Sequence, residues 1–410
     1  MPASAIHEST VATVAAHRCM VELFPEPLNV TGAAGRLVDL TFTVKDVVKV
    51  RGARLTAGLG ATLVEAGPGE NSFVSRMLAE GVSCLGITAS SELAFDLTGE
   101  LGVPAPSNPR GPDLQTGGSS SGSAVAVSLG FGDFSIVTDT GGSARVPAAC
   151  CGVIGFKPSH ERLPTDETVR LSGTCDHLGV ITRDLDVLGR VLDLDDSMGG
   201  MTGGRDRPSV AIPQGYLRRH LSAPAQAWFD SLCTALAAGG LDVHDVDLEF
   251  LHGVEAIYAT IVPYEAFRQH EALLRRNDVP LSPPMRARLE AAGRIGDCEY
   301  AAALGRMKHL RERMTEVSLT CPVLLLPTLP EPAPTRGQTV TMIGGERVLL
   351  RDATLALTAF ANLVGGPAVA FPAKVAGHGS QSVQLVGLGR NDGEVLAAAR
   401  HIRTISTASE

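Results

Sequence analysis

Hydrophobic and polar positions follow one another along this chain in a way that predicts helices and strands in turn. Residues 37–50 alternate apolar and polar side chains around β-branched positions, which predicts one or two strands. Apolar residues at helical spacing over 71–82 precede a short buried strand at 84–88. Helices that alternate with strands are typical of α/β proteins, so the pattern predicts an α/β fold.

The rest of the chain continues this alternation. Residues 8–23 are predicted as a helix that ends at Pro25 and Pro27, because proline cannot continue a helix. The glycine-rich residues 198–208 are predicted as a flexible joint. Further helices are predicted at 121–130, 185–194, 224–240, 288–318 and 393–404, and further strands at 134–139, at 209–213, within 321–335, within 363–373 and at 382–387.

Composition narrows the expected partners and location. The chain has 410 residues, 44% of them hydrophobic, and a formal net charge of -9. Lys and Arg form no long runs, so we expect no nucleic-acid partner. No stretch reaches the roughly 18 uninterrupted apolar residues of a membrane span. The N-terminal residues lack the basic and apolar regions of a secretory signal, so the expected location is the cytoplasm, away from membranes.

The cysteines and histidines do not predict a metal site or a disulfide framework. The 8 cysteines are irregularly spaced and include no C-x-x-C pair, and no H-E-x-x-H motif is present. We therefore expect no metal and no cofactor. Cys150 and Cys151 are interpreted as small buried hydrophobic residues rather than catalytic thiols.

Two Gly-Gly-Ser turns carry the strongest chemical signal in the chain, one ending at Ser119 and one at Ser143. Alone, the first could be a flexible loop or a phosphate cradle, although it lacks the Gly-Lys-Ser/Thr of a P-loop. A serine nucleophile needs a base, and the sequence offers neither a clear histidine partner nor a G-x-S-x-G elbow. Lys45, inside an apolar strand-like segment, is the candidate base, because burial favours the neutral amine. Alone, it could equally be an edge-strand lysine whose amine reaches water.

Together these pieces resemble the amidase signature family of Ser-Ser-Lys amide hydrolases. The long ordered stretch GGSSSGSA…TDTGGSARVPAACCGVIGFKP carries the resemblance. FTVKD and GITASSELAF upstream, and DHLGVITRD, LLLPTLP and ANLVGGPA downstream, extend it over nearly the whole chain. It implies the amidase signature fold, with a central mixed β-sheet of many strands covered on both faces by α-helices.

The resemblance also implies a role for each catalytic residue. Ser143 would be the nucleophile, Ser119 would relay protons after a cis peptide with Gly118, and Lys45 would be the neutral general base. Asp139 and Arg145 are interpreted as a structural ion pair. Backbone N–H groups would bind the oxyanion at Thr140, Gly141, Gly142 and Ser143.

The same resemblance implies one amidase signature domain over 1–410. Its catalytic core would cover about 37–195 and 320–405, and a variable substrate-pocket region about 196–320. The expected binding partner is a small-molecule amide substrate. The sequence does not decide between a monomer and a homodimer. Within the family, the amino-acid sequence is most similar to compact arylacetamide hydrolases, such as the enzymes that hydrolyse indole-3-acetamide. One alternative is an amidase or acyl transferase for another small amide, such as a biuret-like compound or a biosynthetic intermediate. The others are a glutaminase subunit of an amidotransferase and a non-catalytic amidase-like interaction module.

Overall fold

A mixed sheet of eleven strands runs through the part of the chain that the structure describes. The structure is a computed structural model, and it describes residues 8–29, 35–194, 209–276, 278–377, 379–389 and 391–407. The strands lie in the order β1-β3-β2-β4-β6-β5-β12-β13-β9-β7-β8. Their bounds are β1 Met20–Leu28, β2 Thr41–Lys45, β3 Ser83–Thr88, β4 Phe134–Asp139, β5 Ile154–Lys157, β6 His177–Thr182, β7 Ser209–Gln214, β8 Asp242–Asp247, β9 Val323–Pro327, β12 Ala368–Val375 and β13 Gly379–Gly387.

Parallel and antiparallel pairs both occur in this sheet. Strand β2 is parallel to both β3 and β4, and β7 is parallel to both β8 and β9. The strands from β4 through β6, β5, β12 and β13 to β9 pair antiparallel, as β1 does with β3. The mixed sheet that the resemblance implies is therefore confirmed.

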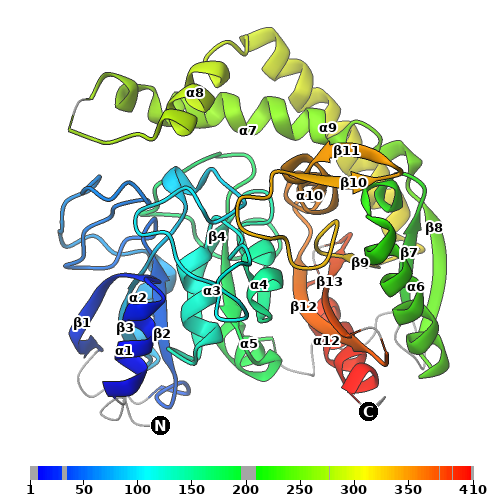
Figure 1. The fold of residues 1–410 in the computed structure, drawn as a ribbon, viewed down its shortest axis with the longest axis horizontal. Helices are drawn as coiled ribbons and strands as arrows, with labels where there is room; N and C mark the ends of the chain where they lie inside the picture. The colour runs from blue at the N-terminus through cyan, green and yellow to red at the C-terminus, as the bar shows by residue number, and fades with distance from the viewer. Residues whose placement is uncertain are drawn as a thin grey trace.

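Helices cover both faces of the sheet. Every residue of β3, β4 and β6 is buried, which requires a layer on each side. Helices α3 and α4 contact each other and pack on the strands around β4 and β5, whereas α5 and α6 both contact α12, which packs on β12 (Figure 1). These helices span α3 Ser121–Ser128, α4 Arg145–Cys151, α5 Leu185–Leu192, α6 Ala223–Ala238 and α12 Asp392–Thr407, and two others lie near the N-terminus, α1 Glu8–Ala16 and α2 Ser72–Ala79.

A second helical group lies beyond one end of the strands (Figure 1). Helix α7 contacts both α8 and α9, and it also contacts α10 and α11. The bounds are α7 Val254–His270, α8 Pro283–Ala292, α9 Asp297–Ser318, α10 Leu350–Thr358 and α11 Phe360–Val364. A small hairpin of β10 (Val340–Ile343) and β11 (Glu346–Leu349) precedes α10.

The N-terminal prediction was wrong in part. The helix ends at Ala16, and residues 20–28 form β1 instead of continuing the helix. Pro25 and Pro27 lie inside this strand. Proline is tolerated there because β1 is at the edge of the sheet and its ladder with β3 is irregular between Leu23 and Leu28.

One further segment differs from its prediction, and a second agrees with it. The single helical segment at 288–318 is the end of α8 followed by α9, separated by a turn between Gly293 and Gly296. Residues 37–50 hold one strand, β2, and the segment continues as turns after Lys45. The expected joint at 198–208 lies outside the described residues. Over the described residues, no helix is both long and apolar enough to cross a membrane.

Candidate active site

Strand β2 brings Lys45 to the same edge of the sheet as the end of β4. The two strands are parallel neighbours, so their carboxyl ends meet. Lys45 is the last residue of β2, and its side chain is fully buried. Its Nζ lies 2.7 Å from Ser119 Oγ and 2.9 Å from Thr138 Oγ1. The structure therefore brings together the lysine and the first serine that the sequence singles out.

The environment of Lys45 favours the neutral amine. Burial lowers the pKa of Lys45 to about 7, against the opposing negative charges of Asp46, Asp139 and Asp176. A lysine in water titrates near 10.4. The amine is thus able to accept a proton near neutral pH.

Ser119 lies in the turn that precedes α3. Its peptide bond with Gly118 is cis, and its side chain is fully buried. The Ser91 N–H donates to the Ser119 carbonyl at 2.9 Å, which fixes the turn against the chain that follows β3. Ser119 Oγ is thereby held toward Lys45.

Ser143 lies in the turn between β4 and α4, beside the Ser119 turn. The Ser120 N–H donates to the Ser143 carbonyl at 3.3 Å, so the two Gly-Gly-Ser turns contact each other directly. Ser143 is 4% exposed, whereas Ser119 is fully buried. Within the described residues, no hydrogen bond joins the two serine hydroxyls. Hydrogen bonds of catalytic groups are often long before substrate binds.

A buried ion pair holds the Ser143 turn, as the sequence predicts for Asp139 and Arg145. The Arg145 guanidinium donates to both Asp139 carboxylate oxygens at 3.0 Å, and both side chains are fully buried. Burial alone would raise the pKa of Asp139, but the charge and hydrogen bonds of Arg145 hold it well below its usual range. Arg145 also donates to Asn362 Oδ1 on α11 and to Gln384 Oε1 on β13.

The backbone N–H groups of the turn do not all face the same way. The Gly142 N–H donates to Asp139 Oδ1 at 2.8 Å, so it is not open toward a substrate. The expectation of four oxyanion donors therefore needs a correction. Within the described residues, the N–H groups of Thr140, Gly141 and Ser143 have no such partner and stay open.

Several residues that the sequence analysis did not single out support this turn. Thr358 Oγ1 donates to the Gly141 carbonyl at 2.6 Å. Tyr258 of α7 lies so close to Gly141 that a Cβ there would be 2.3 Å from the tyrosine hydroxyl oxygen. Thr140 Oγ1 donates to Asp176 at 2.6 Å, and burial raises the pKa of Asp176 to about 6. Apolar residues at helical spacing over 254–262 could have predicted α7, but Pro263 interrupts that pattern.

The thiols near the turn behave as structural residues. Cys150 and Cys151 are buried in α4, and burial raises the pKa of both, that of Cys150 to about 12. Thiols at such pKa values are protonated and weakly nucleophilic at neutral pH. Within the described residues, no group of three or more His, Cys, Asp or Glu is placed to hold a metal ion.

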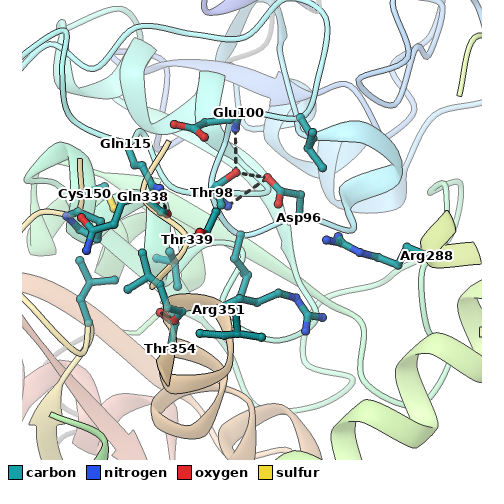
Figure 2. A pocket seen from close by; sticks show the side chains of 17 residues that line it. Asp96, Thr98, Glu100, Gln115, Cys150, Arg288, Gln338, Thr339, Arg351 and Thr354 are labelled. Atoms are coloured by element: carbon teal, nitrogen blue, oxygen red, sulfur yellow. Dashed lines mark hydrogen bonds between the residues drawn. The ribbon is translucent and has the colours of Figure 1, made fainter. Parts of the chain in front are cut away.

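A cavity of about 330 Å³ lies next to the Ser143 turn (Figure 2). Val146 of α4 lines it and lies 3.0 Å from the position of a Cβ on Gly142. Thr354 of α10 lines it too, one helical turn before Thr358. Most of the lining comes from residues 96–150 and 329–354, and the variable region predicted at 196–320 contributes Arg288. The lining combines nine polar or charged residues with Val146 and five leucines, Leu97, Leu101, Leu329, Leu349 and Leu350.

Known proteins resemble this chain in sequence over most of its length. A family model described as Amidase matches residues 26–396. Amidase 1 of Arabidopsis thaliana is 41% identical over 170 residues, which cover 40% of this chain and 40% of that protein. A glutamyl-tRNA(Gln) amidotransferase subunit from Thermus thermophilus is 30% identical over 408 residues, which cover 88% of this chain and 84% of that protein.

The fold agrees as well. A solved structure described as the crystal structure of amidase has a TM-score of 0.87 and 31% identity, and the match covers 97% of this chain and 94% of that chain. The family model, the Thermus relative that aligns with most of this chain and the shared fold all indicate the same family. The chain belongs to the amidase signature family.

Proposed function

We propose that this protein hydrolyses the C–N bond of a small primary amide through Lys45, Ser119 and Ser143. The observation that carries the proposal is the 2.7 Å contact between the buried Lys45 Nζ and Ser119 Oγ. A buried lysine near its neutral form, in contact with a serine beside a second serine turn, is suited to proton transfer.

The first half of the reaction forms an acyl-enzyme. Ser143 Oγ attacks the amide carbonyl carbon and gives its proton to Ser119, while Ser119 gives its own proton to the neutral Lys45 amine. The negative oxygen of the tetrahedral intermediate faces the open N–H groups of Gly141 and Ser143. Collapse of the intermediate breaks the C–N bond. Ser119 protonates the leaving nitrogen, which departs as ammonia, and takes back the proton held by Lys45.

The second half regenerates the enzyme. Water attacks the acyl ester on Ser143, and its proton passes through Ser119 to Lys45. When the C–O bond to Ser143 breaks, the proton returns to Ser143 and the carboxylic acid leaves. Each group ends in the protonation state in which it began, so no other reactant is needed.

The substrates we propose first are arylacetamides such as indole-3-acetamide. The similarity of the sequence to compact arylacetamide hydrolases supports this class, as do the five leucines that line the cavity next to the Ser143 turn. A panel of primary amides that includes biuret and indole-3-acetamide, read by ammonia release, would rank the candidates. Adding hydroxylamine as an acceptor would distinguish acyl transfer from hydrolysis.

Mass spectrometry tests the proposed nucleophile. A slowly turned-over activated amide or a fluorophosphonate should leave its acyl or phosphonyl group on Ser143, and Ser143→Ala should remain unmodified. Cys298→Ala, which changes an exposed cysteine, is a matched control that should label like the wild type. A group found on another residue would overturn the assignment.

A second candidate is the glutaminase subunit of an amidotransferase. It is favoured by the 30% identity to the Thermus amidotransferase subunit over 88% of this chain. Glutamine hydrolysis that appears only after partner subunits are added would support it. Hydrolysis of other primary amides by the purified chain alone would favour the first proposal.

A further inference from the structure

Two arginines from different helices enter the cavity beside the Ser143 turn. Arg288 comes from α8 and Arg351 from the first turn of α10, and Figure 2 shows both side chains reaching into the same space. Burial, followed by the like charge of Arg351, lowers the pKa of Arg288. Two positive charges therefore face each other in a partly enclosed space, an arrangement that an anion between them would stabilise.

The contacts of these two arginines do not use all of their N–H donors. Arg288 Nη1 donates to the Phe95 carbonyl, and the guanidinium lies over the Phe95 ring. Arg351 pairs with Asp352, its neighbour in the chain, at 3.4 Å, and the Asp352 side chain is about half exposed. A guanidinium has five N–H donors, so both groups keep donors for a further partner.

The carboxylates near the arginines are already engaged. Asp96 Oδ2 accepts from the Thr98 N–H, the Thr98 hydroxyl and the Gly99 N–H. Glu100 accepts from the Gly337 N–H at 2.7 Å. Both acids stabilise turns in the cavity wall. The charges of Asp96 and Glu92 offset part of the Arg288 charge, whereas Arg351 has Asp352 as its ion-pair partner.

The cavity brings these charges near the Ser143 turn, because Val146 of α4 and Thr354 of α10 also line it. Aliphatic residues such as Leu97 and Leu350 line it together with the two arginines. A substrate that places its amide at Ser143 and extends into this cavity would thus meet apolar side chains and two guanidinium groups. Such a cavity fits an acyl group with an apolar middle and an anionic far end.

We propose that Arg288 and Arg351 form an anion subsite, and that the preferred substrate is a primary amide whose acyl group ends in a carboxylate. An arylacetamide with a carboxylate on its ring meets both requirements. The proposal rests on the amidase function proposed above and narrows its substrate class. Either guanidinium can bind a carboxylate through two parallel hydrogen bonds.

The test compares two amides that differ in one charge. The value of kcat/KM is measured for phenylacetamide and for 4-carboxyphenylacetamide with the wild type, R288Q, R351Q and the double variant. The wild type should prefer the carboxylate. Each single variant should raise the KM for 4-carboxyphenylacetamide about 10- to 100-fold, the range expected for a lost hydrogen bond to a charged group. The kcat/KM for phenylacetamide should change much less.

The control removes a positive charge that does not face the cavity. Arg347 is exposed on β11, four residues before Arg351 in the chain, and R347Q should behave as the wild type with both amides. An equal loss with the neutral and the charged amide in R288Q and R351Q would overturn the anion subsite, as would a wild type with no preference for the carboxylate.

A binding measurement separates this inference from the catalytic proposal. Calorimetry with S143A and the product 4-carboxyphenylacetate needs no turnover. Binding that is lost in S143A/R288Q and in S143A/R351Q supports the subsite even if the wild type hydrolyses no amide, which would overturn only the catalytic proposal. Absence of binding to S143A would overturn the subsite while amide hydrolysis by the wild type stands.

Discussion

At the scale of single residues, the proposed chemistry depends on a lysine that is buried away from water. Burial lowers the pKa of Lys45, so its amine can lose a proton near neutral pH. An arginine at this position would stay protonated, because its charge is delocalised over the guanidinium group. Its partners Ser119 and Thr138 are hydroxyls and therefore accept either protonation state. The environment thus sets the pKa, and no histidine is needed for proton transfer.

The pH dependence of the reaction follows from this pKa. Below pH 7 the amine is protonated and cannot accept a proton, so kcat/KM should rise with pH and level off above about 7. Lys45→Met should lower kcat by about 100-fold or more, the usual contribution of a general base, and should abolish this rising limb. A pH profile of kcat/KM with a neutral amide measures both effects. A limb that rises only near pH 10 would contradict the assignment.

Gly141 is a second residue whose identity the structure explains. A Cβ there would lie 2.3 Å from the Tyr258 hydroxyl oxygen, closer than any unstrained contact. We expect Gly141→Ala to displace the turn or the tyrosine and to lower kcat more than it raises KM. Activity measured alongside thermal unfolding would show the effect.

A matched glycine provides the control for Gly141→Ala. Gly305 lies inside α9 with no atom within 4 Å of a built Cβ. Gly305→Ala should leave activity unchanged and should raise stability by up to about 1 kcal/mol, because alanine favours the helix. Restoration of activity in the double variant Gly141→Ala with Tyr258→Ala would confirm the collision as the cause.

At the scale of elements, Arg145 joins three parts of the chain. It binds Asp139 at the end of β4, Asn362 on α11 and Gln384 on β13. The Ser143 turn therefore sits between a strand and a helix whose mutual position is fixed by one buried guanidinium. Removing one partner of a buried ion pair leaves an uncompensated charge.

Loss of the Asp139 charge should accordingly destabilise the protein. We expect Asp139→Asn to lower the free energy of unfolding by about 3–5 kcal/mol, since Arg145 would stay charged and buried. Urea unfolding followed by fluorescence of the single tryptophan, Trp228, would measure the change. Glu249→Gln, which breaks an exposed ion pair with Arg219, should change it little. A comparable loss in both variants would contradict this account.

The elements also show which parts of the fold a sequence can predict. The segments at 84–88 and 134–139 are uniformly apolar or small, and they are the buried strands β3 and β4. Residues 20–28 mislead because an edge strand tolerates prolines that otherwise signal a break. The ion pair of Asp139 with Arg145 was predicted from nearby positions, whereas Tyr258 was not, because its contact with Gly141 arises only from the packing of α7.

At the scale of the whole molecule, the open sheet has two edges, β1 and β8. Unpaired edge strands invite association with other strands. Strand β1 carries two prolines, and β8 reads DVHDVD with exposed carboxylates at Asp242, Asp245 and Asp247. The prolines of β1 and the carboxylates of β8 both disfavour pairing of these strands with the sheet of another molecule.

Removing these charges should therefore promote self-association. We expect Asp242→Val with Asp247→Val to shift the protein toward larger species, because the edge of β8 becomes apolar while its backbone groups stay unpaired on one side. Sedimentation velocity at several concentrations would detect the shift. Glu299→Val on α9 changes an exposed charge away from any edge and should not. Unchanged sedimentation of the β8 variant would contradict this role.

Arg145 contacts residues far away in the sequence, which has a consequence for folding during translation. All three proposed reacting side chains lie within the first 143 residues, yet Arg145 depends on Asn362, which is 217 positions later. A growing polypeptide on the ribosome therefore holds the nucleophile long before the groups that position it have been made. Hydrolysis should begin only once translation of the C-terminal strands is complete, which makes the onset of turnover a direct readout of finished folding.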